Sequence, residues 1–218
     1  MKAKLILFIL FLPWISQSQD SKLGNWLIYF GNKKIDAKWN WHHEVQYRNY
    51  NAVGDLEQLL LRTGIGYNLA ENNNNILLGY GFIHSQNYLP NSADKIEIDE
   101  HRIFQQFITR QKFGRFNIQH RYRFEQRFID RDFRLRLRYF LACTLALTRN
   151  ELTDNTLYLS GYNEIFLNTN NTKFDRNRLY GGIGYKINNH VQLEAGYMVQ
   201  YLDSRARDQV NLIAFVAF

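Results

Sequence analysis

Residues 116–128 read FNIQHRYRFEQRF, and apolar and polar side chains alternate along most of this stretch. Successive side chains of a β-strand point to opposite faces, so the alternation sorts these residues into two sets. One set is aromatic and aliphatic: Phe116, Ile118, Tyr122, Phe124 and Phe128. The other is polar and largely cationic: Asn117, Gln119, Arg121, Arg123, Glu125 and Arg127. The stretch therefore predicts a strand with one apolar face and one charged face.

The same two-residue period recurs along the chain. It predicts eleven strands, near residues 24–32, 38–49, 57–69, 75–87, 97–112, 115–128, 132–148, 156–168, 176–187, 190–202 and 208–218. Alternating segments of this length are typical of an all-β fold, an antiparallel up-and-down transmembrane β-barrel, here of about 10–12 strands. Even strand counts are the rule in such bacterial barrels. We therefore expect either that the first segment is a plug or extension, or that the count misses a strand.

The N-terminal segment has the pattern of a secretory signal peptide. Lys2 and Lys4 precede an apolar run over residues 5–12, and the small Ser16 and Ser18 suit a cleavage site after Ser18. A permanent anchor helix, the alternative, needs about 20 apolar residues. We expect residues 1–18 to be removed on export, and residues 19–218 to form a single barrel domain because no linker composition divides them.

The last predicted strand ends on Phe218. An alternating apolar strand that closes on an aromatic residue resembles the signal by which outer-membrane barrels reach their assembly machinery. The expected location is the cell outer membrane, with its lipids and the barrel assembly machinery as partners. The formal charge of +7 could suit nucleic acid, but export argues against that partner. A soluble periplasmic β-sandwich is the alternative fold.

Ten arginines lie between residues 102 and 138. Uncompensated charge is costly in a narrow lumen, so carboxylates must lie among them. We predict a lumen network of charged residues with inward phase: Glu44, Arg62, Glu100, Arg102, Arg121, Arg123, Glu125, Arg127, Arg134, Arg136, Arg138, Glu164, Arg178 and Glu194. Such a network would hold a structural barrel or a narrow pore in register. Alternatively, five of these arginines line a route or pocket for a small anion such as phosphate or carboxylate: Arg121, Arg123, Arg134, Arg136 and Arg138.

The sequence offers no catalytic constellation. Outer-membrane barrels include lipid-modifying acyl hydrolases built on Ser/His pairs, which makes this class the enzymatic alternative. His84 and Ser85 are adjacent, so they point to opposite faces of a strand and His84 cannot activate Ser85. The other histidines lack the fixed spacing of a zinc site. We expect no metal and no cofactor.

Several motifs resemble one family. EHRIFQQ at 100–106, RYRFEQRF at 121–128 and RLRY at 136–139 are similar to outer-membrane barrels catalogued as domain of unknown function 2490 (DUF2490), common in Bacteroidetes-type bacteria. GNW at 24–26 and NRL at 177–179 extend the similarity to most of the expected domain. The resemblance implies a barrel fold and an outer-membrane address. It implies no substrate or activity.

Overall fold

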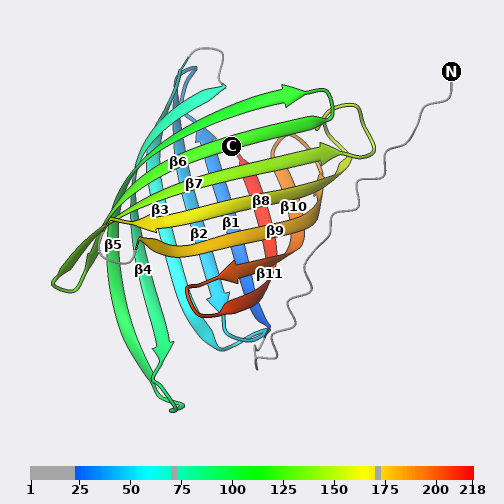
Figure 1. Ribbon diagram of the computed structural model, residues 1–218. Coiled ribbons are helices and arrows are strands. Elements are labelled where there is room, and N and C mark those ends of the chain that lie inside the picture. Colours follow the sequence, from blue (N-terminus) through cyan, green and yellow to red (C-terminus); the bar gives the residue numbers. More distant parts are fainter. Residues whose placement is uncertain (1–22, 70–72, 170–172) are drawn as a thin grey trace.

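The computed structural model describes residues 23–69, 73–169 and 173–218. The predicted signal peptide, residues 1–18, lies outside the described residues. The described residues form eleven strands (Figure 1): β1 (Gly24–Lys34), β2 (Trp39–Asn49), β3 (Leu56–Asn68), β4 (Asn74–Tyr88), β5 (Lys95–Phe113), β6 (Phe116–Ile129), β7 (Asp132–Ala146), β8 (Thr156–Asn168), β9 (Phe174–Lys186), β10 (Val191–Tyr201) and β11 (Ala206–Ala217). Each predicted segment corresponds to one strand. The all-β prediction is therefore confirmed.

The strands form one sheet that closes into a barrel, with each strand beside the next along the chain. Consecutive strands are antiparallel, but β1 and β11 are parallel and pair from Gly24↔Gln209 to Asn32↔Ala217. The expected even count is therefore wrong for the described residues, and the first segment is a strand of the wall. An odd number of up-and-down strands leaves the first and last strands running the same way, so a parallel ladder closes the barrel. The closed sheet also excludes the β-sandwich.

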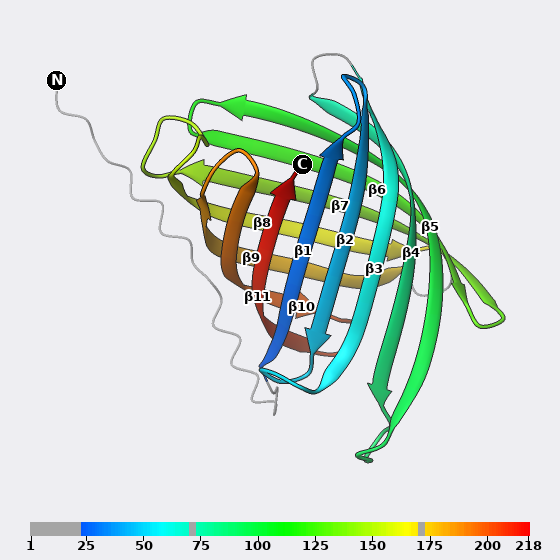
Figure 2. The ribbon, with the colours of Figure 1, turned by 180° about the vertical axis from the view of Figure 1, so that it is seen from behind.

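The parallel closure places the start of β1 and the end of β11 on opposite rims. We call one rim the Phe218 end; it carries connections such as 35–38 and 114–115. The other is the Gly24 end, with connections such as 89–94. Strands β4 and β5 have 15 and 19 residues, and their hairpin projects beyond the neighbouring strands at the Gly24 end (Figures 1 and 2).

A side-chain cap shapes the first turn at the Phe218 end. Oδ1 of Asp36 accepts hydrogen bonds from the backbone amides of Lys38 at 2.7 Å and Trp39 at 2.8 Å. The amides of Trp39 and Lys38 lower the pKa of the Asp36 carboxyl, because they stabilise its charged form. The carboxylate thereby fixes the turn that brings β2 back beside β1.

The pattern of burial is the reverse of that in a protein with a hydrophobic core, because polar side chains are buried and apolar side chains are exposed. Among the described residues, 38 large hydrophobic side chains are exposed and 13 hydrophobic residues are buried, whereas 21 polar or charged residues are buried. The two-residue period explains this, because one face of every strand forms the outer wall and the other lines the lumen. No described helix is long and apolar enough to cross a membrane.

Glycines of the inner wall give room to aromatic rings. The ring of Tyr158 in β8 lies over Gly184 in β9, and the ring of Phe104 in β5 lies over Gly79 in β4. A methyl group built on either glycine would overlap the ring. Both rings are fully buried. The glycines therefore set how tightly aromatic side chains fill the lumen.

Gly184→Ala is expected to destabilise the barrel by about 1–3 kcal/mol, because the added methyl forces Tyr158 from its position. The measurement is the denaturant midpoint of refolded protein. The matched control is Gly181→Ala on the same strand, where a Cβ meets nothing within 4 Å. Equal midpoints for the two variants would contradict the packing argument.

Candidate functional site: a charged lumen

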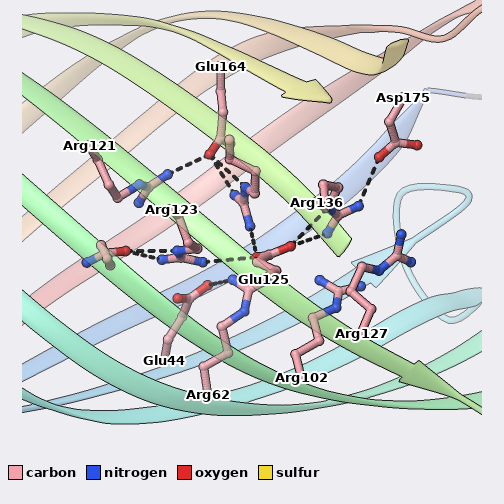
Figure 3. Close-up of polar contacts among 12 residues, drawn as sticks. Glu44, Arg62, Arg102, Arg121, Arg123, Glu125, Arg127, Arg136, Glu164 and Asp175 are labelled. Carbon is pink, nitrogen blue, oxygen red and sulfur yellow. Dashed lines mark hydrogen bonds and ion pairs between the residues drawn. The ribbon is translucent and has the colours of Figure 1, made fainter. Parts of the chain in front are cut away.

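Charged side chains from several strands meet inside the barrel (Figure 3). Glu125 of β6 lies at the centre of the largest cluster and has no exposed surface. Its carboxylate pairs with Arg136 Nη2 at 2.6 Å and Arg138 Nη1 at 2.6 Å, and Arg123 Nη1 lies 3.7 Å away. Glu125 and Arg136 are directly opposite in the β6–β7 register. Two alternating strands in this register thus produce the central pair.

Glu164 of β8 extends the cluster around the lumen. Its carboxylate pairs with Arg138 Nη2 at 2.6 Å, Arg121 Nη2 at 2.8 Å and Arg178 Nη1 at 3.8 Å. Arg138 therefore bridges Glu125 and Glu164. Because these residues come from β6, β7, β8 and β9, the ion pairs link four neighbouring strands across the interior.

Two smaller clusters lie elsewhere in the lumen, one on β5 and β6 and the other on β2 and β3. Glu100 pairs with the Nε atoms of Arg102 and Arg127, both at 2.5 Å. These two arginines face each other across β5 and β6, and the shared carboxylate offsets their repulsion. Glu44 of β2 pairs with Arg62, its direct neighbour on β3.

Several lumen arginines also make cation–π contacts with aromatic rings. Four guanidinium groups lie over the Phe166 ring, at 4.4–5.9 Å from its centroid: Arg136, Arg138, Arg176 and Arg178. Arg48 stacks on Trp26 at 3.7 Å, and Arg178 lies 4.8 Å from the same ring. Such cation–π contacts stabilise an arginine that has few carboxylates near its guanidinium group.

A cavity of about 380 Å³ lies in the lumen beside the network. Tyr50, Asn87 and Leu202 belong to its lining and lie at the Gly24 end. Its lining includes eleven arginines: Arg48, Arg62, Arg102, Arg127, Arg134, Arg136, Arg138, Arg176, Arg178, Arg205 and Arg207. The lining carboxylates are Glu57 and Glu100. The cavity, which we call the arginine cavity, is therefore strongly cationic.

Some arginines of the cavity lack an acidic partner. In the described part of the chain, no carboxylate lies within 4.0 Å of Arg48 or Arg205. Arg48 is buried and donates to the side-chain oxygens of Gln46 and Gln58. Burial, together with the nearby Glu57, raises the pKa of the Tyr50 phenol, so this ring adds no negative charge at neutral pH. The excess of positive charge is therefore not offset by the cavity wall.

Twelve of the predicted lumen residues take part in the ion clusters above: Glu44, Arg62, Glu100, Arg102, Arg121, Arg123, Glu125, Arg127, Arg136, Arg138, Glu164 and Arg178. The structure places the other two differently. Arg134 is half-exposed and pairs with Asp132 at the Gly24 end. Glu194 is buried beside Tyr158 and Tyr180, and no ion pair joins it to a described cation.

The structure does not bring all five arginines of the predicted anion pocket to one cavity. Arg134, Arg136 and Arg138 line the arginine cavity, whereas Arg121 and Arg123 do not. Arg121 lies over the Phe140 ring, 4.2 Å from its centroid, and pairs with Glu164. Arg123 donates to Gln106.

Sequence reasoning missed several residues of the site. Arg48 and Arg207 have the inward phase of their strands, so the alternation that identified the others could have found them. Asp175 pairs with Arg136 at 2.9 Å. It lies where the β8–β9 register shifts between Phe166 and Leu167. A bulge of this kind turns a side chain out of phase, so alternation could not have identified Asp175.

His84 and Ser85, the adjacent pair considered from the sequence, lie on opposite faces of β4. His84 Nδ1 lies 2.7 Å from Asp99 Oδ1 on the outer face, whereas Ser85 accepts a hydrogen bond from Gln58 on the inner face. Within residues 23–69, 73–169 and 173–218, no group of three His, Cys, Asp or Glu side chains could hold a metal ion.

Comparisons with known proteins give a family but no activity. The model of a family described as protein of unknown function (DUF2490) matches residues 23–211. An uncharacterized protein of Methylorubrum extorquens is 29% identical over 174 residues, which cover 75% of this chain and 72% of that protein. No solved structure matches. The chain belongs to the DUF2490 family.

Proposed function

We propose that this protein spans the outer membrane as a β-barrel whose lumen is closed by the Arg/Glu network, and that it serves as a structural protein or a narrow pore. The observation that carries the proposal is the inverted burial, with an apolar outer wall around a charged interior. A wall of this kind would be exposed to solvent in water but is covered by lipid in a bilayer. Outer-membrane lipids are then its partners.

Most exposed aromatic residues lie towards one of the two rims, as expected for interfacial girdles, although Tyr80, Phe107, Tyr122 and Tyr197 lie between them. The Phe218 end carries Trp39, Trp41, Phe113, Phe116, Tyr185 and Phe218. The Gly24 end carries Tyr47, Tyr88, Phe128, Phe133 and Tyr201. The shortest strands have 11 residues, which at a tilt of about 40° rise roughly 28 Å. This height suits an apolar band of about 25 Å.

Polar side chains on the outer wall pair with each other. Tyr80 Oη lies 2.6 Å from His101 Nδ1, and Tyr139 Oη lies 2.9 Å from His120 Nδ1. The amides of Gln105 and Gln126 bond reciprocally across β5 and β6. An unpaired polar group is costly in an apolar medium, and these pairs reduce that cost.

We expect little conductance, with weak anion selectivity, when refolded protein is inserted into planar bilayers. Glu125, Phe166 and Tyr158 are among the buried side chains that fill the lumen, and the surplus of arginines favours anions. Single-channel recording with reversal potentials in a salt gradient tests this. Large, cation-selective channels would contradict a lumen closed by the network.

Whether the protein resides in the outer membrane can be tested separately from its conductance. Cell fractionation, combined with electrophoresis of unboiled and boiled samples, should give a heat-modifiable band in the outer-membrane fraction, because a closed barrel resists detergent until heated. A soluble band whose mobility does not change on boiling would contradict the proposal.

A further inference from the structure

We propose that the arginine cavity is a binding site for a small multivalent oxyanion, a molecule that carries two or more phosphate or carboxylate groups. This inference rests on the proposed function, because a barrel embedded in a membrane presents the Gly24 end of its lumen to one aqueous compartment. It goes beyond the proposed function because it assigns a class of ligand to the Gly24 end of the lumen.

The first argument is charge. The arginine cavity is lined by eleven arginines and two glutamates. Five carboxylates outside the lining pair with some of these arginines: Glu44, Glu125, Asp132, Glu164 and Asp175. They leave Arg48 and Arg205 without an acidic partner among the described residues, and Nε of Arg62 is buried without a hydrogen-bond partner. A buried donor without a partner costs free energy, and an anion that accepts from Arg62 Nε would remove this cost.

The second argument is preorganisation. Arg48 and Arg178 are both held against the Trp26 ring, and Arg178 Nε donates to Gln200 at 2.9 Å. Their planar groups are therefore fixed before a ligand arrives, which reduces the entropy lost on binding. Guanidinium groups offer the two-point contacts that phosphate and carboxylate oxygens match. Several fixed forks around one cavity favour a ligand with more than one anionic group.

The third argument is size and access. The volume of about 380 Å³ falls within the range of small-molecule pockets. Arg134 and Arg205 are exposed at the Gly24 end of the lining, so the positive potential reaches the solvent and would attract anions. The ligand could be a dissolved phosphorylated or carboxylated molecule, or the phosphate of a lipid headgroup at the rim. Both sources present the same oxyanion chemistry.

Inorganic pyrophosphate is a suitable probe, titrated by calorimetry into protein in phosphatidylcholine nanodiscs at low salt. The expected result is saturable binding. Arg48→Gln should weaken it about tenfold or more, because the variant loses a charged hydrogen bond to the ligand. Arg205→Gln should also weaken binding, and we expect it to fold because Arg205 is exposed and its side chain makes no hydrogen bond or ion pair with the described residues. Arg115→Gln is the matched control, since Arg115 is exposed at the Phe218 end and outside the cavity.

The outcomes separate the site from the barrel. A heat-modifiable, membrane-inserted wild type that binds no pyrophosphate overturns the site but leaves the proposed function intact. Equal dissociation constants for wild type and both cavity variants also overturn it. Binding that weakens in Arg205→Gln supports the site even if Arg48→Gln fails to fold. A second nanodisc containing lipid A distinguishes the sources: unchanged affinity for pyrophosphate indicates a dissolved ligand, and reduced affinity indicates that headgroup phosphates compete for the cavity.

Discussion

Glu125→Gln is expected to lower the free energy of unfolding by about 3–5 kcal/mol, because removing one partner of a buried ion pair leaves the other charge uncompensated. Glu125 has no exposed surface and pairs with both Arg136 and Arg138 at 2.6 Å. The amide that replaces it keeps the shape but loses the negative charge. Denaturant unfolding in lipid vesicles, followed by tryptophan fluorescence and by the heat-modifiable band, measures the loss.

Glu151→Gln is the matched control for this prediction. Glu151 pairs with Lys112 at 2.6 Å, but its side chain is 53% exposed. Exposed pairs contribute about 0–1 kcal/mol, so the control should unfold almost like the wild type. If both variants lost the same stability, the lumen network would not be the element that holds the barrel together.

Leu61→Arg is expected to destabilise the membrane-inserted barrel by about 2–4 kcal/mol, the cost of a cation near the bilayer midplane. Leu61 lies near the middle of β3 and is 41% exposed on the outer wall. Its cross-strand neighbours Val45 and Phe82 are apolar, so no carboxylate faces the new charge there. Equilibrium folding into vesicles measures the difference from the wild type.

The size of this effect distinguishes a membrane barrel from a soluble one. In water, an arginine on an exposed wall would change stability by no more than about 0.5 kcal/mol. Val53→Arg is the control, because Val53 lies in the β2–β3 connection and is 83% exposed. A Leu61→Arg variant as stable as Val53→Arg would contradict membrane insertion.

Local periodicity accounts for how well the strands could be predicted. The sorting of residues 116–128 into an apolar and a charged face agrees with the outward Tyr122 and the inward Glu125. This works because the period of two is a property of the extended backbone and needs no knowledge of distant neighbours. The same reasoning found most lumen charges and failed at Asp175, where the β8–β9 register shifts.

The strand count shows where a general rule failed. The even-number rule suggested that the first segment was a plug or extension, or that a strand had been missed, yet all eleven segments form strands among the described residues and β1 pairs with β11 in parallel. Whether the edges of a sheet meet depends on the whole wall and not on any one segment. Local sequence patterns therefore could not decide how this barrel closes.

The sequence by itself determined which residues are extended, which face of each strand is apolar and most of the charges that point inward. Only the tertiary structure decided that Arg138 joins Glu125 to Glu164, that four guanidinium groups gather on Phe166, and that eleven arginines surround one cavity. The physical reason is that alternation is set by neighbouring residues of the chain. Ion-pair partners and cavity walls are set by the register and curvature of strands far apart in sequence.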